Sequence, residues 1–478
     1  MLYQSLLNEE SFLNRNIYAA VLPLGLCILL LGGCAEAPVK VDDNHVEQSL
    51  QDVTGLTTDD VEKAVQKSSM NLWDVFALAV KHTETLASSA ENVEQAKAQN
   101  NQALGSWLPQ VYLNDYVQQQ SNQYITGAYN PLFAPPANTL ANTLNIGVTE
   151  MLFTGLTQVA AIQGAGANID YQNYNYRNQS RTLLLNVANA FYNVLAFEEA
   201  EAAYEKSKDL NEQILVVEKQ WQKMGRSQTE DVANTEALLA QVLGDMENNK
   251  FQLAQARETL STLANIPADQ PLVSEEAYAT PTYTAEEAEA KVDDRPDVKA
   301  AKSNVDIADA ELLQAHGEHL PSVAIAGQYY LQKDGDSPTA DWNIQLVASL
   351  PLFEGGQVVA QEDSAASKKR QAEMNLSLTR RTAFDDVREA YKSLIDSTSE
   401  TDAYQKAVDA YQADYLDVLH DYKLNLTTNL QLLQTMTSLE TTQISYLKAK
   451  YQALYDQIWL KVATGELPKM SVYGDDKK

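Results

Sequence analysis

The longest uninterrupted feature of the sequence is the run from Thr157 to Met224, which contains no proline. Its apolar and small residues recur at steps of three and four, a spacing that predicts one helix with a narrow seam for packing. At 1.5 Å per residue, this helix would be roughly 100 Å long. A compact globular domain cannot enclose so long a helix, and we therefore expect other elements to lie beside it along its whole length.

A second copy of this unit follows about 200 residues later in the chain. Gln357 to Leu424 is again free of proline and again spaced for a helix. Shorter motifs repeat in the same order: residues 103–109 (ALGSWLP) match residues 315–321 (AHGEHLP), and both copies have Leu-Phe-x-Gly before the long run. The chain is therefore one structural unit written twice.

The composition argues against several classes of function. A net charge of −30 and an isoelectric point near 4.5 argue against nucleic-acid binding, because phosphate backbones are bound by basic surfaces. The two cysteines, Cys27 and Cys34, both lie in the apolar N-terminal region, which leaves no thiol chemistry for the rest of the chain. We find no nucleophile–base pair, P-loop or dinucleotide motif, and we expect neither enzymatic activity nor a cofactor.

Two histidines, His316 and His319, lie three residues apart, and this spacing places both imidazoles on one side of a helix. The first repeat has Leu104 and Trp107 at the matching positions. We interpret the histidines as residues of a junction between a helix and a strand, and not as a metal site.

The N-terminal segment is predicted to direct export. Val21 to Leu31 is apolar but too short to span a bilayer, and Arg15 precedes it. Leu31-Gly32-Gly33-Cys34 resembles the lipobox of bacterial lipoproteins, in which the cysteine becomes the acylated N-terminus. We assign residues 1–33 to a signal peptide, Cys34 to lipidation and residues 34–70 to a polar tether. An ordinary signal peptide or an anchor helix is the alternative.

Four segments alternate between apolar and polar residues, as strands with two different faces do. Their lengths fit tilted membrane strands, with aromatic residues near their ends. A small soluble sheet is the alternative. Four strands cannot close a transmembrane barrel, and open edges in lipid are prohibitive, so closure needs further copies of the chain. Three copies would give twelve strands. The segments are Leu108–Gln119, Thr143–Phe153, Leu320–Gln332 and Asp341–Phe353, joined by the loops Gln120–Asn142 and Lys333–Ala340.

Each long helix is predicted to reverse at a tight turn and to return as a shorter helix. Gly225 and Asn425 lie in the turns and tolerate the left-handed conformation that a helix C-terminus needs. Thr229 and Thr428 are the predicted N-caps of the returning helices. The predicted returning helices are Glu230–Ala264 and Leu430–Thr464. A first helix is predicted over Asn71–Gly105. Two shorter helical parts, Leu86–Gly105 and Val298–Gly317, are predicted to stack end-on against the returning helices.

These elements define the predicted domains. Repeat 1 covers residues 71–265 and repeat 2 covers residues 292–468, each in the order helix, strand, strand, long helix, return helix. Residues 266–291 contain three prolines and form a connector around the middle of the helices, and residues 469–478 form a polar tail.

This doubled layout resembles the outer-membrane efflux protein family, the TolC-like channels, over about residues 71–468. Leu108-Pro109 and Leu320-Pro321 open strands, and Pro351 to Gly356 leaves one, as in that family. The resemblance implies a mostly α-helical fold with a transmembrane β-barrel contribution: a homotrimer whose four strands per chain form a 12-stranded barrel and whose helices form a long periplasmic barrel. It also implies a passive duct in the outer membrane of a Gram-negative bacterium, anchored there through Cys34.

The resemblance further implies partners, namely a periplasmic adaptor docked on the helix tips and an inner-membrane pump. Some relatives close the tunnel with an aspartate ring, and this chain has Gln431 and Gln434 at those positions. Asp414, Asp417 and Asp421 instead share one side of the second long helix and are candidates for lining the constriction; a solvated outer face is the alternative. The candidate adaptor contacts at the tips are Gly225, Arg226, Ser227, Thr229, Asn425, Leu426, Thr427 and Thr428. The alternative is that these residues only form the turns.

Two further functions remain open from the sequence. The chain could be the outer-membrane component of type I protein secretion, because some members of the family serve that route. It could also be a non-conducting structural coiled-coil lipoprotein, which would explain the helices and Cys34 but not four membrane-length strands. The sequence does not identify the exported substrate.

Overall fold

The computed structural model describes residues 58–121, 138–274, 276–334 and 340–465, all within one compact unit of the chain. The predicted signal peptide, Cys34, the larger part of the tether, the middle of each strand loop and the tail 469–478 lie outside the described residues.

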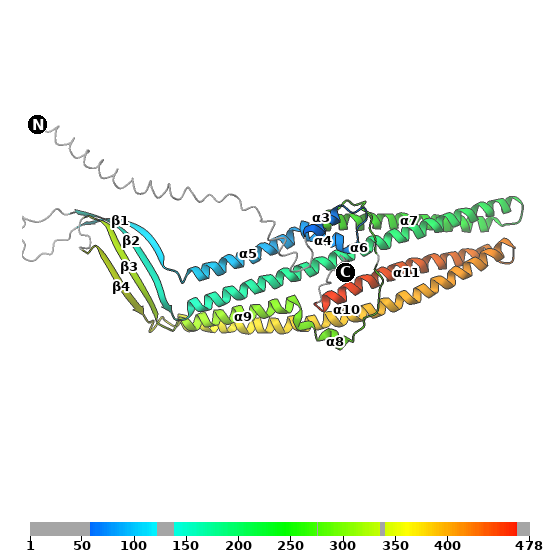
Figure 1. Ribbon diagram of the computed structural model, residues 1–478. Coiled ribbons are helices and arrows are strands. Elements are labelled where there is room, and N and C mark those ends of the chain that lie inside the picture. The colour runs from blue at the N-terminus through cyan, green and yellow to red at the C-terminus, as the bar shows by residue number, and fades with distance from the viewer. Residues whose placement is uncertain (1–57, 122–137, 275, 335–339, 466–478) are drawn as a thin grey trace, which may run out of the picture. The chain divides into compact units, whose positions relative to one another are not determined.

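The described chain is mostly helical and contains a four-stranded antiparallel sheet (Figure 1). The helices in this part are α3 (Thr58–Val65), α4 (Leu72–His82), α5 (Glu84–Gly105), α6 (Thr157–Lys223), α7 (Thr229–Ala264), α8 (Ala285–Glu289), α9 (Pro296–Gly317), α10 (Gln357–Lys423) and α11 (Asn429–Ala463), with a 3-10 turn η2 (Val292–Asp294). The strands are β1 (Gln110–Ser121), β2 (Asn138–Thr154), β3 (Ser322–Asp334) and β4 (Trp342–Ser349). The doubled order predicted from the sequence is confirmed.

The two long helices have equal lengths, 67 residues each in α6 and α10. Each follows a residue in the left-handed conformation, Leu156 before α6 and Gly356 before α10. Each ends one residue earlier than the sequence predicted. The buried residues of α6 follow the predicted seam, for example at Tyr176, Leu184 and Phe191.

The long helices are packed into one layer with the shorter ones. Helices α5 and α7 pack against α6, α6 packs against α9 and α11, and these two pack against α10. This order places α5 and α7 at one margin of the layer and α10 at the other (Figure 1). A Cβ atom on Gly465, just after α11, would lie 3.4 Å from the Cα of Arg295, just before α9. The return helix and the short helix of repeat 2 therefore meet end to end, as predicted.

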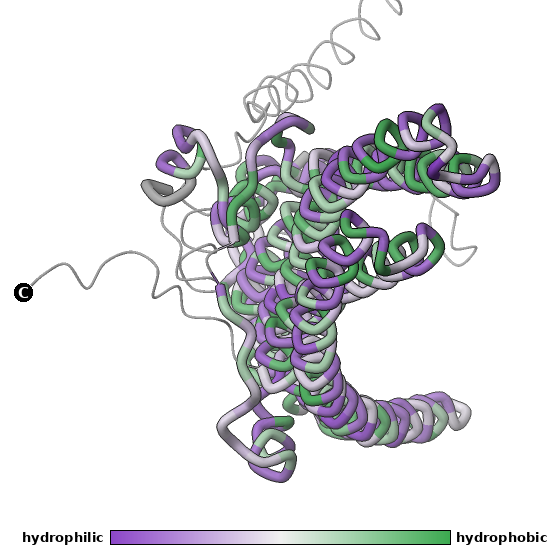
Figure 2. The backbone as a smooth tube through the Cα atoms, turned by 90° about the vertical axis from the view of Figure 1, so that its right-hand side faces the viewer, coloured by the Kyte–Doolittle hydropathy of each residue, from purple (hydrophilic) through white to green (hydrophobic). Residues whose placement is uncertain are grey.

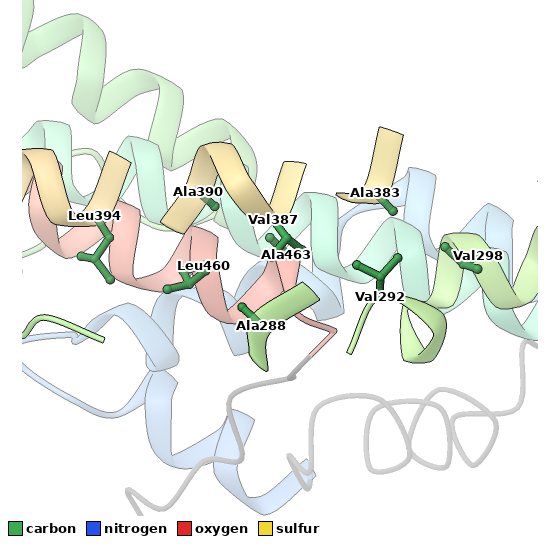
Figure 3. Close-up of a cluster of buried hydrophobic side chains, with 9 residues drawn as sticks. All are labelled: Ala288, Val292, Val298, Ala383, Val387, Ala390, Leu394, Leu460 and Ala463. Atoms are coloured by element: carbon green, nitrogen blue, oxygen red, sulfur yellow. The ribbon is translucent and has the colours of Figure 1, made fainter. Parts of the chain in front are cut away.

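A cluster of small and branched apolar side chains holds this meeting point together. Figure 3 shows its members converging from α8, η2, α9, α10 and α11: Ala288, Val292, Val298, Ala383, Val387, Ala390, Leu394, Leu460 and Ala463.

A buried guanidinium lies beside this cluster. Arg295 donates hydrogen bonds to the carbonyl oxygens of Ala383 (3.2 Å) and Ala463 (3.3 Å) and forms ion pairs with Asp297 (2.6 Å) and Asp386 (2.9 Å). A second buried arginine, Arg181 of α6, donates to the carbonyl of Val462. Both arginines satisfy carbonyls at the C-terminal end of α11, where cations also suit the helix dipole.

One face of the sheet is mostly apolar and the other mostly polar, although Asp115 of β1 and Glu150 of β2 lie on the apolar face. Neighbouring strands place Leu113, Ile146, Tyr329 and Trp342 side by side in one row, and the next row on the other face contains Tyr112, Gly147, Gln328 and Asn343. Large side chains of the apolar row are exposed in the single chain, Trp342 to 62%. On the polar face, the Tyr112 and Thr149 hydroxyls lie 3.3 Å apart. The predicted alternation is confirmed.

The backbones of the two repeats touch where the helices meet the sheet. A Cβ atom on Gly317, the last residue of α9, would lie 2.3 Å from the carbonyl oxygen of Gly155, which follows β2. The reverse contact, from Gly155 to the Gly317 oxygen, would be 2.2 Å. No side chain fits at either position, so these two glycines set the distance between the repeats.

Several predicted boundaries were wrong. The helix expected over Asn71–Gly105 is interrupted at Thr83, which has an extended conformation and separates α4 from α5. The predicted tether ends in the helix α3, and Met70 forms a β-bridge with Leu272 of the connector. The connector itself contains α8.

The predicted strands are also shifted or resized. Strands β1 and β3 begin after Pro109 and Pro321, whose nitrogen atoms cannot donate to the sheet. Strand β2 has 17 residues, longer than predicted, and β4 has 8, because its pairing with β3 stops at Ser349.

The helices carry few long apolar stretches. Figure 2 shows hydrophilic and hydrophobic positions interspersed along them. In the ranges that the structure describes, every helix falls short of the apolar length that a membrane crossing requires.

Adding one methyl group at the contact between the repeats should destabilise the protein. We expect Gly317→Ala to lower the free energy of unfolding by about 1–3 kcal/mol, because the new Cβ must push the Gly155 carbonyl away. Denaturant unfolding of the detergent-extracted protein measures this change.

The matched glycine of repeat 1 provides the control. A Cβ on Gly105 would meet no atom within 4 Å, and we expect Gly105→Ala to be neutral or to stabilise the protein by less than about 1 kcal/mol. Equal losses of stability in both variants would contradict the assignment of the contact to Gly317.

Candidate functional site at the helical tips

The reversals after α6 and α10 have the same backbone geometry. Gly225 and Asn425 adopt the left-handed conformation, with φ of 72° and 57°. The N–H of the next residue reaches back to a carbonyl five residues earlier, from Arg226 to Trp221 (2.8 Å) and from Leu426 to Asp421 (2.9 Å). This bond pattern closes the end of a helix and satisfies its last carbonyls. The structure therefore confirms both predicted turns.

The caps of the returning helices differ between the repeats. Thr428 is the N-cap of α11, and its hydroxyl accepts the Gln431 N–H (3.3 Å), as predicted. The prediction for Thr229 was wrong, because Gln228 has the extended N-cap conformation and Thr229 is the first residue of α7. The Asp231 carboxylate accepts the Gln228 N–H (3.0 Å). This bond stabilises Gln228 as the N-cap, one residue before the predicted Thr229.

The tips expose several large apolar side chains. Met224, Leu424, Leu426 and Leu430 are between 55% and 71% exposed, and Arg226 is exposed beside them. Lys223 and Lys423 are exposed next to the same turns. Exposed apolar side chains mixed with cations are typical of surfaces that bind another protein.

Packing beneath the turns joins the two hairpins. The Trp221 and Tyr422 rings lie 5.2 Å apart, and Ile214 of α6 packs into a cluster of α10 and α11 side chains. The Asn429 side-chain amide donates to the Asp231 carbonyl (3.0 Å) and to the Thr235 hydroxyl (3.2 Å). The tips are therefore held to each other within one chain.

The predicted constriction residues lie just beneath the second tip. Asp414, Asp417 and Asp421 are all exposed on α10. The Asp414 carboxylate accepts a hydrogen bond from the Thr435 hydroxyl of α11 (3.2 Å). Gln431 accepts one from Thr427 (2.8 Å), and Gln434 is exposed.

The sequence analysis missed a buried carboxylate under the first tip. Glu218 is 1% exposed and accepts a hydrogen bond from Ser227, which also lies 3.5 Å from Asp231. Burial raises the pKa of Glu218, and the nearby Asp231 charge raises it further, while the Ser227 bond opposes the shift. The matching residue of repeat 2, Val418, is apolar and buried, and this mismatch on the helix seam was the available signal.

The histidine pair forms a small junction cluster. His316 and His319 each contact one oxygen of Glu362 on α10, both at 3.1 Å. Across the part of the chain that the structure describes, no group of His, Cys, Asp and Glu is arranged to hold a metal ion.

Protonation of Glu218 should stabilise the first tip. Because its pKa is higher in the native protein than in an opened tip, the native tip binds the proton more tightly and loses stability as pH rises through this pKa. We expect hydrogen-exchange protection of residues 218–231, corrected for intrinsic rates, to fall severalfold across that range. Glu218→Gln, which cannot ionise, should remove this pH dependence.

Glu236→Gln is the matched control, because Glu236 is an exposed carboxylate that pairs with Lys219 (2.7 Å) on the same hairpin. It should leave the pH dependence unchanged. A Glu218→Gln protein that still loses protection as pH rises would contradict the role given to Glu218.

The fold matches that of known outer-membrane channels. Outer membrane protein TolC of Salmonella enteritidis is 27% identical over 419 residues, which cover 83% of this chain and 82% of that protein. The pyoverdine export outer membrane protein OpmQ of Pseudomonas aeruginosa is 22% identical over 453 residues, covering 91% and 94%. The crystal structure of the Campylobacter jejuni CmeC outer membrane channel superposes with a TM-score of 0.73 at 18% identity, over 84% of this chain and 86% of CmeC.

The family match covers both repeats. Residues 76–265 and 290–466 match the family described as Outer membrane efflux protein. The two matched ranges correspond to the helix–strand–strand–helix units seen in the structure. This chain belongs to the outer membrane efflux protein family.

Proposed function

We propose that this protein is the outer-membrane duct of a tripartite efflux system and passively conducts substrates that an inner-membrane pump delivers through a periplasmic adaptor. Its family and its similarity to export channels such as OpmQ support this function. The substrate passes without chemical change, and the duct itself uses no cofactor. The observation that carries the proposal is the sheet, whose two outer strands need partners from other copies.

The outer edges of the sheet are open in the single chain. Within the described residues, β1 pairs with β2 and β4 pairs with β3, which leaves one side of each outer strand without a sheet partner. Lipid offers no hydrogen bonds to such an edge, so a membrane sheet must close on itself. Pairing β1 of one chain with β4 of the next would close a barrel, and three chains would supply twelve strands.

The margins of the helical layer support the same closure. Large apolar side chains are exposed on α7 at one margin, including Leu243 and Phe251, and on α10 at the other, including Met374, Leu378 and Leu416. Contact between α5 and α7 of one copy and α10 of the next would bury them. A homotrimer therefore satisfies the strands and the helices together.

The tips are the proposed contact with the adaptor. Both turns present their residues away from the sheet (Figure 1), and their exposed leucines and Arg226 suit a protein partner. The tip residues of this proposal are Gly225, Arg226, Ser227, Thr229, Asn425, Leu426, Thr427 and Thr428.

The outer membrane of a Gram-negative bacterium is the proposed location, with acylation of Cys34 as an additional anchor. The exposed apolar face of the sheet supports insertion in lipid. A structural coiled-coil lipoprotein, the competing hypothesis, does not account for strands with one apolar and one polar face.

Cross-linking tests the closure of the sheet. A bis-maleimide that spans about 10 Å should join Leu113→Cys on β1 to Leu346→Cys on β4 of a neighbouring chain, because paired strands lie about 5 Å apart. We expect a ladder that ends at the trimer on a denaturing gel. The control pair, Leu113→Cys with Ile146→Cys, is adjacent within one chain and should give no ladder. A ladder that stops at the dimer or extends beyond the trimer would contradict the proposed assembly.

Ion selectivity tests the acidic side of α10. If Asp414, Asp417 and Asp421 line the constriction, replacing all three by Asn should reduce the cation preference of single channels in planar bilayers, measured from the reversal potential in a salt gradient. The same change of charge at Asp269, Asp293 and Asp294, near the connector, is the control. Unchanged selectivity in the α10 variant would place these aspartates outside the narrow part of the tunnel.

A further inference from the structure

A cavity with an aromatic floor lies between α6 and α11. Its volume is about 270 Å³, slightly below the roughly 300–1,000 Å³ of typical small-molecule sites. Tyr192 and Phe197 contribute from α6, and Tyr451 and Tyr455 contribute from α11. The Tyr192 and Tyr451 rings lie 6.2 Å apart across the seam between the two helices.

The floor tyrosines are fixed by hydrogen bonds to carboxylates. The Tyr192 hydroxyl donates to Glu276 of the connector (3.1 Å), and the Tyr451 hydroxyl donates to Glu199 (2.7 Å). Burial raises the pKa of both phenols, which therefore stay neutral. Tyr192 and Tyr451 are only 2% and 5% exposed, so the half-buried side chains of Phe197 and Tyr455 offer the cavity most of its aromatic surface.

The nearby carboxylates also have partners of their own. Glu199 forms an ion pair with Lys450 (3.0 Å), whose ammonium lies 4.8 Å from the centre of the Tyr451 ring. Glu276 also accepts a hydrogen bond from the Trp73 indole (3.0 Å). Glu199 is thus paired with a cation, whereas the two hydrogen bonds to Glu276 come from neutral donors.

The rim offers a cation and an amide. Lys448 lines the cavity and is exposed, and among the described residues its ammonium has no ion-pair partner. Asn189 accepts a hydrogen bond from the Asn193 amide (2.9 Å), which leaves its own amide N–H groups available.

The cavity stays open to solvent in the proposed assembly. It lies between α6 and α11, which are internal to the helical layer, while the margins that would contact other copies are α5, α7 and α10. On α11, Gln457 accepts an N–H from Ala279 of the connector (3.1 Å), and nine residues place Gln457 about 180° around the helix from Lys448. The rim therefore faces away from the connector.

We propose that this cavity binds an aromatic monoanion of one or two rings, such as an aromatic carboxylate. The ring lies on Phe197 and Tyr455, in front of the buried Tyr192 and Tyr451. The carboxylate is bound by Lys448 and the Asn189 amide. The Lys448 ammonium at the rim selects an anion over a cation of the same shape. This inference goes beyond the proposed duct and does not depend on conduction.

Binding to the detergent-extracted full-length protein tests the site, with three probes of similar shape and different charge. We expect 2-naphthoate to bind one site per chain in isothermal titration calorimetry. The neutral 2-naphthamide should bind about tenfold more weakly, and the cationic 2-naphthylmethylammonium more weakly still. Absence of naphthoate binding, or binding of the cation at least as tight, would overturn the proposal.

Charge reversal at the rim separates recognition from a structural role. Lys448→Glu should reverse the preference, so that the naphthylmethylammonium ion binds more tightly than naphthoate, whereas Lys423→Gln, an exposed lysine outside the cavity, should change nothing. Tyr455→Leu should weaken all three probes. A Lys448→Glu protein that keeps the preference for naphthoate would show that the probe binds elsewhere. A protein that conducts but binds no naphthoate would refute this site alone.

Discussion

The two open edges of the four-stranded sheet impose the strongest requirement on this protein. Every other strand side in the described sheet is paired, and the apolar face is exposed in the single chain. Water could form hydrogen bonds with the open edges but would leave the apolar face exposed to solvent. Lipid could cover the apolar face but would leave the edges without hydrogen bonds. Pairing between copies is the arrangement that meets both conditions. The order of the helices agrees with pairing between β1 of one copy and β4 of the next. Helices α5 and α7 lie on the side of β1, and α10 lies on the side of β4. One closure therefore serves the membrane part and the helical part.

The sequence repeat explains the framework that the two halves share, and the positions at which the halves differ explain their individual features. Both long helices have 67 residues and reverse through the same hydrogen bonds, so that both tips reach the same depth. The repeats differ at positions where only one of them has an ionisable side chain. Glu218 replaces the buried apolar residue Val418, and Asp414 replaces Ile214, which packs between the hairpins. At the opposite end, Gly155 and Gly317 bring the two repeats into backbone contact, so the helices enter the sheet at a fixed spacing.

The sequence predicted the long helices, the tips and the four strands because these depend on local periodicity, turn residues and repetition. It did not predict the break at Thr83, the N-cap at Gln228 or the length of β2, because those depend on tertiary contacts and on competition between neighbouring caps. Glu218 and the aromatic cavity escaped notice for a related reason. A glutamate on a long acidic helix looks solvated, and Tyr192 and Tyr451 are 259 positions apart until α6 packs on α11. The role of Asp414, Asp417 and Asp421 depends on the assembled trimer and follows from neither the sequence nor one chain.

Single-channel recording in planar bilayers tests the central claim most directly. The purified protein should be compared with a variant in which Trp221→Ala and Asn429→Ala loosen the contacts that join the two tips. If three chains form a closed duct with its narrow end at the tips, both proteins should give discrete current steps, and the variant should have the larger conductance. A protein that inserts as a trimer but conducts no ions, even with its tips loosened, would contradict the account and favour a structural role.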